Sequence, residues 1–344
     1  MSATAQVNVR FDFNNADSTI AFLKKKSATP AEINAFIKTT GVQSLIRKIR
    51  SNDSIACVTL EKIVAGKPTT GKESNFQYEF IKTNLPAMEA FVNTIKANQQ
   101  AIRDSLQGFV RFLPPGKSLD VTVCFLLGGY SSGFTFSDAD YFYVGTHQYK
   151  YDFKSIVNAC QHEIFHNLQS LHRDAMPLMT RMEKDKELPA LYAYYIARNF
   201  FTEGAAEYVA DIDKADPKAP NIKEQLEHAA VNKYRMADNF YLAEKLILDA
   251  YADPEKSDPG MIYTILFDWN WNNPGYAMGK WMMQSLVKAY GDTAINKYLA
   301  ADPMIFLQDY IALAKAEPEK YPYNFSEGFE KMLTDVIVKT AKYN

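Results

Sequence analysis

The apolar and polar positions of the chain follow two kinds of pattern, one typical of strands and one typical of helices. Strict alternation over residues 6–13 predicts a strand, and residues 119–127 and 140–145 are also rich in β-branched and aromatic residues. A glycine-rich stretch over residues 128–133 joins the last two segments. Residues 16–110 instead predict a series of short helices.

Helical periodicity dominates the chain from residue 152 onwards. Earlier in the chain, Thr29-Pro30-Ala31-Glu32 combines a capping threonine, a proline in the first turn and a glutamate three residues after the cap, which is typical of a helix start. The longer predicted helices cover residues 153–172, 188–212, 222–250, 277–290, 303–316 and 325–341. A small sheet followed by long helices predicts an α+β fold that is predominantly helical.

The composition predicts a globular protein with a large core. Of the 344 residues, 47% are apolar and 23% are charged, and the net charge is −2. This apolar fraction excludes a disordered chain, and the balanced charge gives no indication of nucleic acid or an anionic membrane as the main partner. The longest apolar run, residues 121–127, is interrupted by Thr122 and is too short to span a bilayer.

The cysteines and the N-terminus bear on the compartment. Three cysteines without a C-x-x-C spacing are too few for a disulfide scaffold, and Cys160 is expected to be a buried free thiol. Ala3-Thr4-Ala5 resembles the small-residue end of a signal peptide, which favours an exported protein, periplasmic or secreted. An ordinary polar start fits these residues equally well, so a cytoplasmic location stays open.

The sharpest chemical feature is the sequence His162-Glu163-Ile164-Phe165-His166, which matches the H-E-x-x-H motif of zinc peptidases. Two histidines four residues apart lie on one face of a helix, so both imidazoles can reach one ion. Glu163 next to the first histidine can act as a general base on a water molecule activated by the metal.

The surrounding helix supports this interpretation. On a helical wheel the two histidines lie opposite an apolar stripe, so the helix has a core face and a separate face for chemistry. The stripe consists of Val157, Cys160, Ile164, Leu168 and Leu171. The remaining histidines of interest, His147 and His228, are expected at the surface.

A catalytic zinc site needs a third protein ligand. Glu203 is one candidate, because it lies on a second predicted helix with Glu207 four residues later on the same face. Glu207 could then orient a histidine ligand by accepting a hydrogen bond from the ring nitrogen that does not bind the metal. Gly204 costs helix stability but lets another backbone approach closely.

His172 is the rival third ligand, because His162, His166 and His172 reproduce the spacing of metzincin peptidases. In that pattern a glycine three residues after the second histidine turns the chain, whereas here the position is Gln169. On a straight helix His172 lies about 15 Å along the axis from His162, out of reach of the same ion. This geometry favours Glu203.

The metal motif together with Glu203-Gly204-Ala205-Ala206-Glu207-Tyr208 resembles the gluzincin class of zinc metallopeptidases. More narrowly, residues 120–290 resemble bacterial families of unknown function that are described as zinc-dependent peptidases. The resemblance implies one zinc ion per chain bound by His162, His166 and Glu203, with Glu163 as the base and Glu207 holding a ligand. Many gluzincins carry Asp at that last position, which puts the role of Glu207 in doubt.

We expect a zincin-like core flanked by two further regions, the three forming one continuous catalytic unit. A mainly helical region over 1–115 precedes a core over 116–215, in which a small sheet leads into the motif helix. A helical lobe over 216–344 follows.

Peptidases of this kind need a donor for the oxyanion of the tetrahedral intermediate. Tyr276, at a predicted helix entrance, is the best local candidate, although a packing tyrosine fits the position as well. An edge strand over 133–136 or 141–144 could pair with an extended peptide substrate.

These observations predict a zinc-dependent hydrolase, most simply a peptidase with a peptide or protein as substrate. Two alternatives stay open: a zinc-binding module without turnover, and a metzincin-type site that uses His172. No nucleic-acid partner and no membrane span are expected, and the sequence does not determine the oligomeric state.

Overall fold

The computed structural model describes residues 5–136, 140–214 and 217–343. The chain forms two compact units, the first made of residues 1–167 and 218–222 and the second of residues 168–217 and 223–344. Helix α8 (Phe153–His172) runs without a break through residue 168, so it contributes to both units. Ala3 and Thr4 of the suggested signal-peptide remnant lie outside the described residues.

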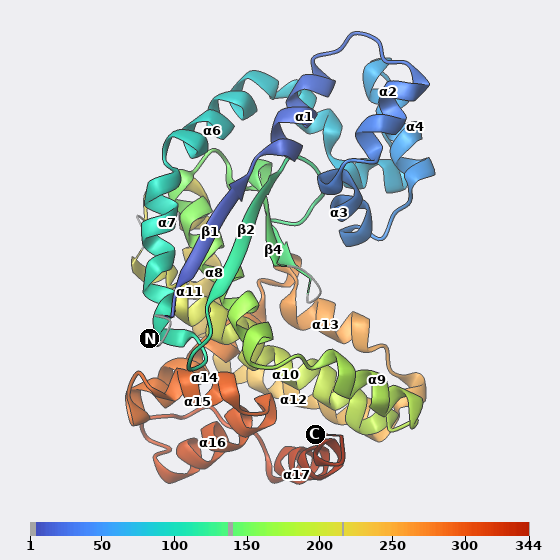
Figure 1. Cartoon of the computed structure of the whole chain (residues 1–344). Coiled ribbons are helices and arrows are strands. Elements are labelled where there is room, and N and C mark those ends of the chain that lie inside the picture. The colour runs from blue at the N-terminus through green and yellow to red at the C-terminus, as the bar shows by residue number, and fades with distance from the viewer. Residues whose placement is uncertain (1–4, 137–139, 215–216, 344) are drawn as a thin grey trace. The chain divides into compact units, whose positions relative to one another are not determined.

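The first unit is built on a four-stranded sheet in the order β1-β2-β4-β3. Strands β1, β2 and β4 are parallel, and β3 is an antiparallel edge strand paired with β4. Figure 1 shows β1, β2 and β4 side by side, with helix α7 along β1. The strands are β1 (Val7–Asp12), β2 (Leu119–Leu126), β3 (Gly133–Thr135) and β4 (Tyr141–Gly145). Strand β2 lies inside the sheet, and its residues form a nearly continuous buried run, as is typical of a parallel strand that is covered on both faces.

Among the described residues of the first unit, seven α-helices precede β2, and the capping box predicted at Thr29 and Glu32 is confirmed. They are α1 (Asn14–Leu23), α2 (Pro30–Ile37), α3 (Thr40–Lys48), α4 (Asp53–Val64), α5 (Tyr78–Thr83), α6 (Leu85–Ala97) and α7 (Gln99–Gln107). The short 3-10 helices are η1 (Gly71–Phe76), η2 (Gly108–Phe112) and η3 (Thr146–Tyr149).

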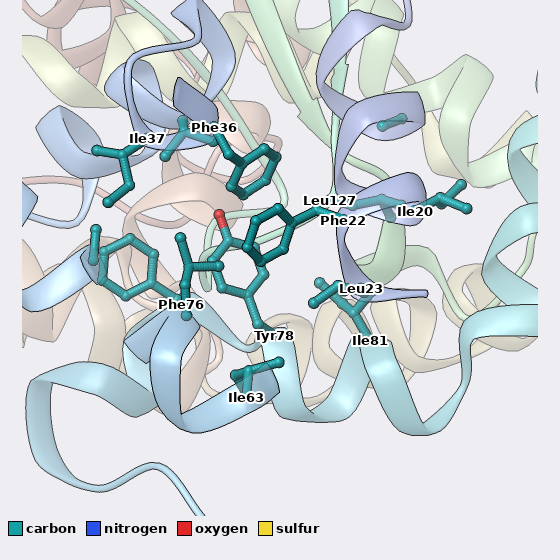
Figure 2. Packing of buried hydrophobic residues seen from close by; sticks show 14 of the residues in the cluster. Ile20, Phe22, Leu23, Phe36, Ile37, Ile63, Phe76, Tyr78, Ile81 and Leu127 are labelled. Carbon is teal, nitrogen blue, oxygen red and sulfur yellow. The ribbon is translucent and has the colours of Figure 1, made fainter. Parts of the chain in front are cut away.

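A hydrophobic core holds α1 to α6 and the end of β2 together. Figure 2 shows the rings of Phe22, Phe36 and Tyr78 gathered in the middle of this core, and Phe22 stacks on Phe36 with centroids 4.6 Å apart. The backbone N–H of Gly129 donates to the Phe76 carbonyl at 2.9 Å. This core therefore anchors the glycine-rich loop that leads into β3.

The second unit is a helical assembly around α10 (Leu188–Val209). Apolar residues surround α10 on all sides rather than on one stripe, which is the pattern of a helix packed on every face. Its neighbours include α9, α12, α14, α16 and α17. The helices of this unit are α9 (Met176–Lys184), α11 (Pro220–Tyr234, whose first residues belong to the first unit), α12 (Met236–Ala252), α13 (Pro259–Phe267), α14 (Pro274–Tyr290), α15 (Ala294–Ala300), α16 (Pro303–Ala316) and α17 (Glu327–Ala341), with η4 (Ile212–Lys214), η5 (Pro254–Lys256) and η6 (Trp269–Trp271).

The expected α+β fold, predominantly helical, is confirmed, and the sheet precedes the motif helix as predicted. The helix expected over 222–250 is instead two helices, because α11 ends before Arg235 and α12 begins after it. The division of the chain into regions 1–115, 116–215 and 216–344 stays a prediction. Within the described parts of the chain, every helix is too short or too polar to cross a bilayer.

Candidate metal centre

The two motif histidines face each other on α8. The Nε2 atoms of His162 and His166 lie 3.1 Å apart, and their ring centroids are 4.8 Å apart with the planes nearly perpendicular. A separation of four residues on a helix produces this pairing, since it places side chains on one face. Both side chains are half-buried, so they remain accessible to an ion.

The spacing of the two nitrogens fits a tetrahedral zinc ion. Two imidazole nitrogens at about 2.0–2.1 Å from zinc, at a tetrahedral angle, stand roughly 3.3 Å apart. The 3.1 Å separation of His162 Nε2 and His166 Nε2 needs only a small adjustment to reach this value. The pair is therefore preorganised as two ligands of one metal ion.

Glu163 directly follows His162 on α8 and is buried, with 7% of its surface exposed. Its carboxylate lies against edge strand β3 at Gly133. Burial, reinforced by the negative charge of Glu163, raises the pKa of the Tyr149 hydroxyl and of the Cys160 thiol. Both neighbours therefore stay protonated and neutral at pH 7.

Glu203 is held by the packing of α10 on α14. A Cβ atom on Gly204 would lie 2.2 Å from the carbonyl carbon of Gly279, and one on Gly279 would lie 2.1 Å from the Phe200 carbonyl oxygen. The two backbones thus cross in contact at a pair of glycines. The prediction that Gly204 permits a close backbone approach is confirmed, and Glu203 next to it is buried, with 9% exposed.

Tyr276 lies one turn before Gly279 on α14 and hydrogen-bonds to Glu203. The hydroxyl donates to the carboxylate, because an ionised carboxylate can only accept. Burial raises the pKa of Tyr276 well above its usual range, and the charge of Glu203 raises it further. The tyrosine therefore keeps its proton and remains a hydrogen-bond donor.

Glu207 follows Glu203 by one turn of α10 and is half-buried. Lys280 on α14 pairs with Asp211 at 3.2 Å and with Asp213 at 3.1 Å. These aspartates and Glu207 raise the pKa of Lys280 although its burial opposes the shift. The negative charge around Glu207 is thus balanced by a cation, and its role in holding a histidine ligand stays a prediction.

Among the residues that the structure describes, His162, His166 and Glu203 form a group that could hold a metal ion. Each offers one ligand atom, and these atoms all lie within 4.8 Å of one another. Two imidazole nitrogens and a carboxylate oxygen are the donor set of a catalytic zinc site, which keeps its fourth position for water or substrate.

Comparison with known proteins agrees with this chemistry. Residues 33–319 match the family described as "Putative zinc dependent peptidase (DUF5700)". The chain belongs to this family. The predicted resemblance to a zinc peptidase is thereby confirmed, and the matched segment contains the histidine pair, Glu203 and Tyr276. No curated protein and no solved structure matches the chain.

The structure of α8 in this DUF5700 family member bears on the rival ligand. Helix α8 is continuous to His172, its last residue. Ten residues of helix separate His172 from His162, which corresponds to about 15 Å along the axis. Gln169, at the position where metzincins turn the chain, instead donates a hydrogen bond to the Thr202 carbonyl of α10 at 2.9 Å.

Two expectations about the surroundings of the motif were wrong. His147 is buried rather than exposed, and its Nε2 lies 2.8 Å from the Gly129 carbonyl oxygen. Burial lowers its pKa to about 4, so it is neutral at pH 7. On the apolar stripe of α8, Cys160, Ile164 and Leu168 are buried as expected, but Leu171 is exposed, because it lies in the last turn of the helix.

Sequence reasoning did not predict the contacts that three residues make around the motif: Gly133, Tyr149 and Gln169. Gly133 touches Glu163, Tyr149 donates to the Ser132 carbonyl at 2.9 Å, and Gln169 binds α10. Their signal in the sequence is weak, since only the glycine-rich loop before β3 marks the region as one where backbone approaches closely.

Proposed function

We propose that this protein is a zinc-dependent peptidase, with His162, His166 and Glu203 as the ligands of one zinc ion. The observation that carries the proposal is the set of three ligand atoms within 4.8 Å of one another. The description of the family supports the same chemistry.

The helix that carries the histidines also supports Glu203 as the third ligand. His166 and Gln169 are three residues apart on the continuous helix α8, so their side chains lie about one turn apart. The amide of Gln169 donates to the carbonyl of Thr202, the residue before Glu203. One hydrogen bond therefore ties the end of the motif helix to the turn of α10 that carries Glu203.

When bound, zinc would supply a Lewis acid that lowers the pKa of water and polarises the scissile carbonyl. Glu163 accepts the proton from the attacking water and then gives it to the leaving amine. His162 and His166 present neutral imidazole nitrogens as ligands, and Glu203 supplies the negative charge of the ligand set.

Edge strand β3 offers a surface for an extended peptide. It is the last strand in the order β1-β2-β4-β3, and Gly133 at its start lies against Glu163. A substrate added to this edge would pair its backbone with β3 and bring a peptide bond close to the base. Of the two segments considered from the sequence, 133–136 contains the edge strand, so we prefer it.

Tyr276 stays our candidate donor to the oxyanion, and its hydrogen bond to Glu203 gives it a further role, holding the carboxylate in place. The two roles predict different consequences of removing the hydroxyl. An oxyanion donor affects turnover alone, whereas a partner of the ligand affects zinc affinity.

The direct test is the zinc content of the wild type, Glu203→Ala and His172→Ala, measured by mass spectrometry after each variant has been shown to fold by circular dichroism. We expect about one zinc per chain in the wild type and in His172→Ala, and loss of zinc in Glu203→Ala. Zinc lost in His172→Ala but kept in Glu203→Ala would refute the ligand set and support the metzincin arrangement.

Peptidase activity needs its own measurement, a digest of a broad peptide library by the zinc-loaded protein. Cleavage that a chelator abolishes and added zinc restores supports the proposal. Bound zinc without any cleavage would contradict it and indicate a zinc-binding module without turnover.

A further inference from the structure

Edge strand β3 lies against the carboxylate of Glu163 at Gly133, which has no side chain. A Cβ atom on Gly133 would lie 2.3 Å from Oε1 of Glu163 and 2.9 Å from its carboxyl carbon. Real Cβ contacts essentially never fall below 3.0 Å, so any residue other than glycine would push the carboxylate away. The backbone of Gly133 is thus one wall of the space that Glu163 occupies.

The wall itself is fixed by the hydrogen bonds of the residues around it. The carbonyl of Ser132 accepts from the Tyr149 hydroxyl at 2.9 Å and from the backbone N–H of Gly145 at 2.7 Å. The hydroxyl of Ser131 donates to the Gly133 carbonyl at 2.9 Å. Because these partners hold both sides of Gly133, a clash there displaces Glu163 rather than the strand.

A second contact keeps the strand parallel to the same face of α8. Thr135 follows Gly133 by two residues on β3, and Asn167 follows Glu163 by four residues on α8. The amide of Asn167 lies 3.5 Å from the Thr135 hydroxyl, and its side chain is buried, with 8% exposed. Two residues of strand and one turn of helix cover nearly the same length, so the two elements stay in step over this distance.

We propose that Gly133 is a positioning residue for Glu163, because the glycine backbone of the edge strand sets where the carboxylate stands. The consequence for catalysis rests on the proposed function, in which Glu163 is the base, but the placement itself does not. Strand β3, on whose edge a substrate would lie, therefore also fixes the position of the base that would act on that substrate.

The test is a double-mutant cycle in which the Tm of each variant is measured by thermal unfolding of the zinc-supplemented full chain. Gly133→Ala is measured in the wild type, in Glu163→Gln, which keeps the shape of the side chain, and in Glu163→Ala, which removes it. Gly108→Ala serves as the matched control, because a Cβ there meets nothing within 4 Å. We expect Gly133→Ala to lower the Tm by several degrees in the wild type and in Glu163→Gln, and to behave like the control in Glu163→Ala. An equal loss of Tm in all three backgrounds, or no loss in any, would overturn the proposal.

Activity adds the readout that a merely structural glycine would not move. Gly133→Ala should lower kcat at least about tenfold while KM and zinc content stay unchanged, because a displacement of about 1 Å at a base is already costly. If the effect of Gly133→Ala on Tm depends on Glu163 as expected but its kcat is unchanged, then Gly133 does not position the base. If the zinc-loaded wild type cleaves no peptide, the proposed function fails, whereas the Tm cycle still decides whether Gly133 places Glu163.

Discussion

Replacing Gly279 by alanine tests the contact between α10 and α14 on which the placement of Glu203 depends. The new Cβ would lie 2.1 Å from the Phe200 carbonyl oxygen, and ordinary contact begins at 3.4 Å, so the helices would have to separate by about 1.3 Å. Both contacting groups are backbone, so neither can rotate away. Overpacking of this kind costs about 3 kcal/mol, and the better helix propensity of alanine returns about 1 kcal/mol.

The expected result is a free energy of unfolding lower by about 2 kcal/mol, measured by urea denaturation. Gly328→Ala in α17 is the matched control, because its Cβ would have only an ordinary contact, 3.4 Å from the Ser326 hydroxyl. Tyr276 lies one turn before Gly279, so the variant should also bind zinc more weakly. If Gly279→Ala and Gly328→Ala change the free energy of unfolding by amounts within about 0.5 kcal/mol of each other, the two backbones do not touch and the reasoning is refuted.

Three further predictions concern single side chains. Glu163→Gln should keep its zinc but lose at least about a hundredfold in kcat, and full activity of this variant in a zinc-dependent assay would exclude Glu163 as the base. Tyr276→Phe should weaken zinc binding about tenfold, as measured by competition with a chelator; a lower kcat at unchanged affinity would instead support the oxyanion role alone. Burial lowers the pKa of His147 to about 4 in the folded state, so the unfolded state binds its proton first as the pH falls below about 6.5. Stability should therefore fall by up to about 3 kcal/mol between pH 6.5 and 4, and urea titrations of His147→Gln should show a correspondingly flatter profile.

The parts of the fold that follow from local patterns could be predicted from the sequence. The helix predicted over 153–172 matches α8, because its periodicity and length are properties of that segment alone. The close approach at Gly204 was also predictable, since a glycine inside a helix needs a packing reason. Both predictions rest on short-range rules that the tertiary structure does not override.

Features that depend on distant partners could not be predicted. The break between α11 and α12 at Arg235 has no proline or glycine to mark it. Its guanidinium donates to the carbonyl of Trp271 at 2.9 Å, and Asn232 donates to the carbonyl of Asn272. The partners lie some 36 to 40 positions further along the chain, so the reason for the break is absent from the local pattern.

The same limit explains the missed residues at the centre. Gly133 matters only because β3 lies against Glu163, and the buried His147 has its hydrogen-bond partner in the distant loop at Gly129. A sequence shows a glycine and a histidine in these places, but neither contact follows from any spacing. Candidate ligands were easier to find, since two of them share one helix and a fixed interval.

The placement of the cysteines gives the chain a built-in reporter of local opening. All three, Cys57, Cys124 and Cys160, lie in the first unit, and none lies in the second. Burial raises the pKa of Cys124 to about 12 and also that of Cys160, so thiolate-specific reagents should react with these two only when the first unit opens. The rate of their alkylation would therefore measure the opening of the sheet and motif helix separately from the melting of the helical unit.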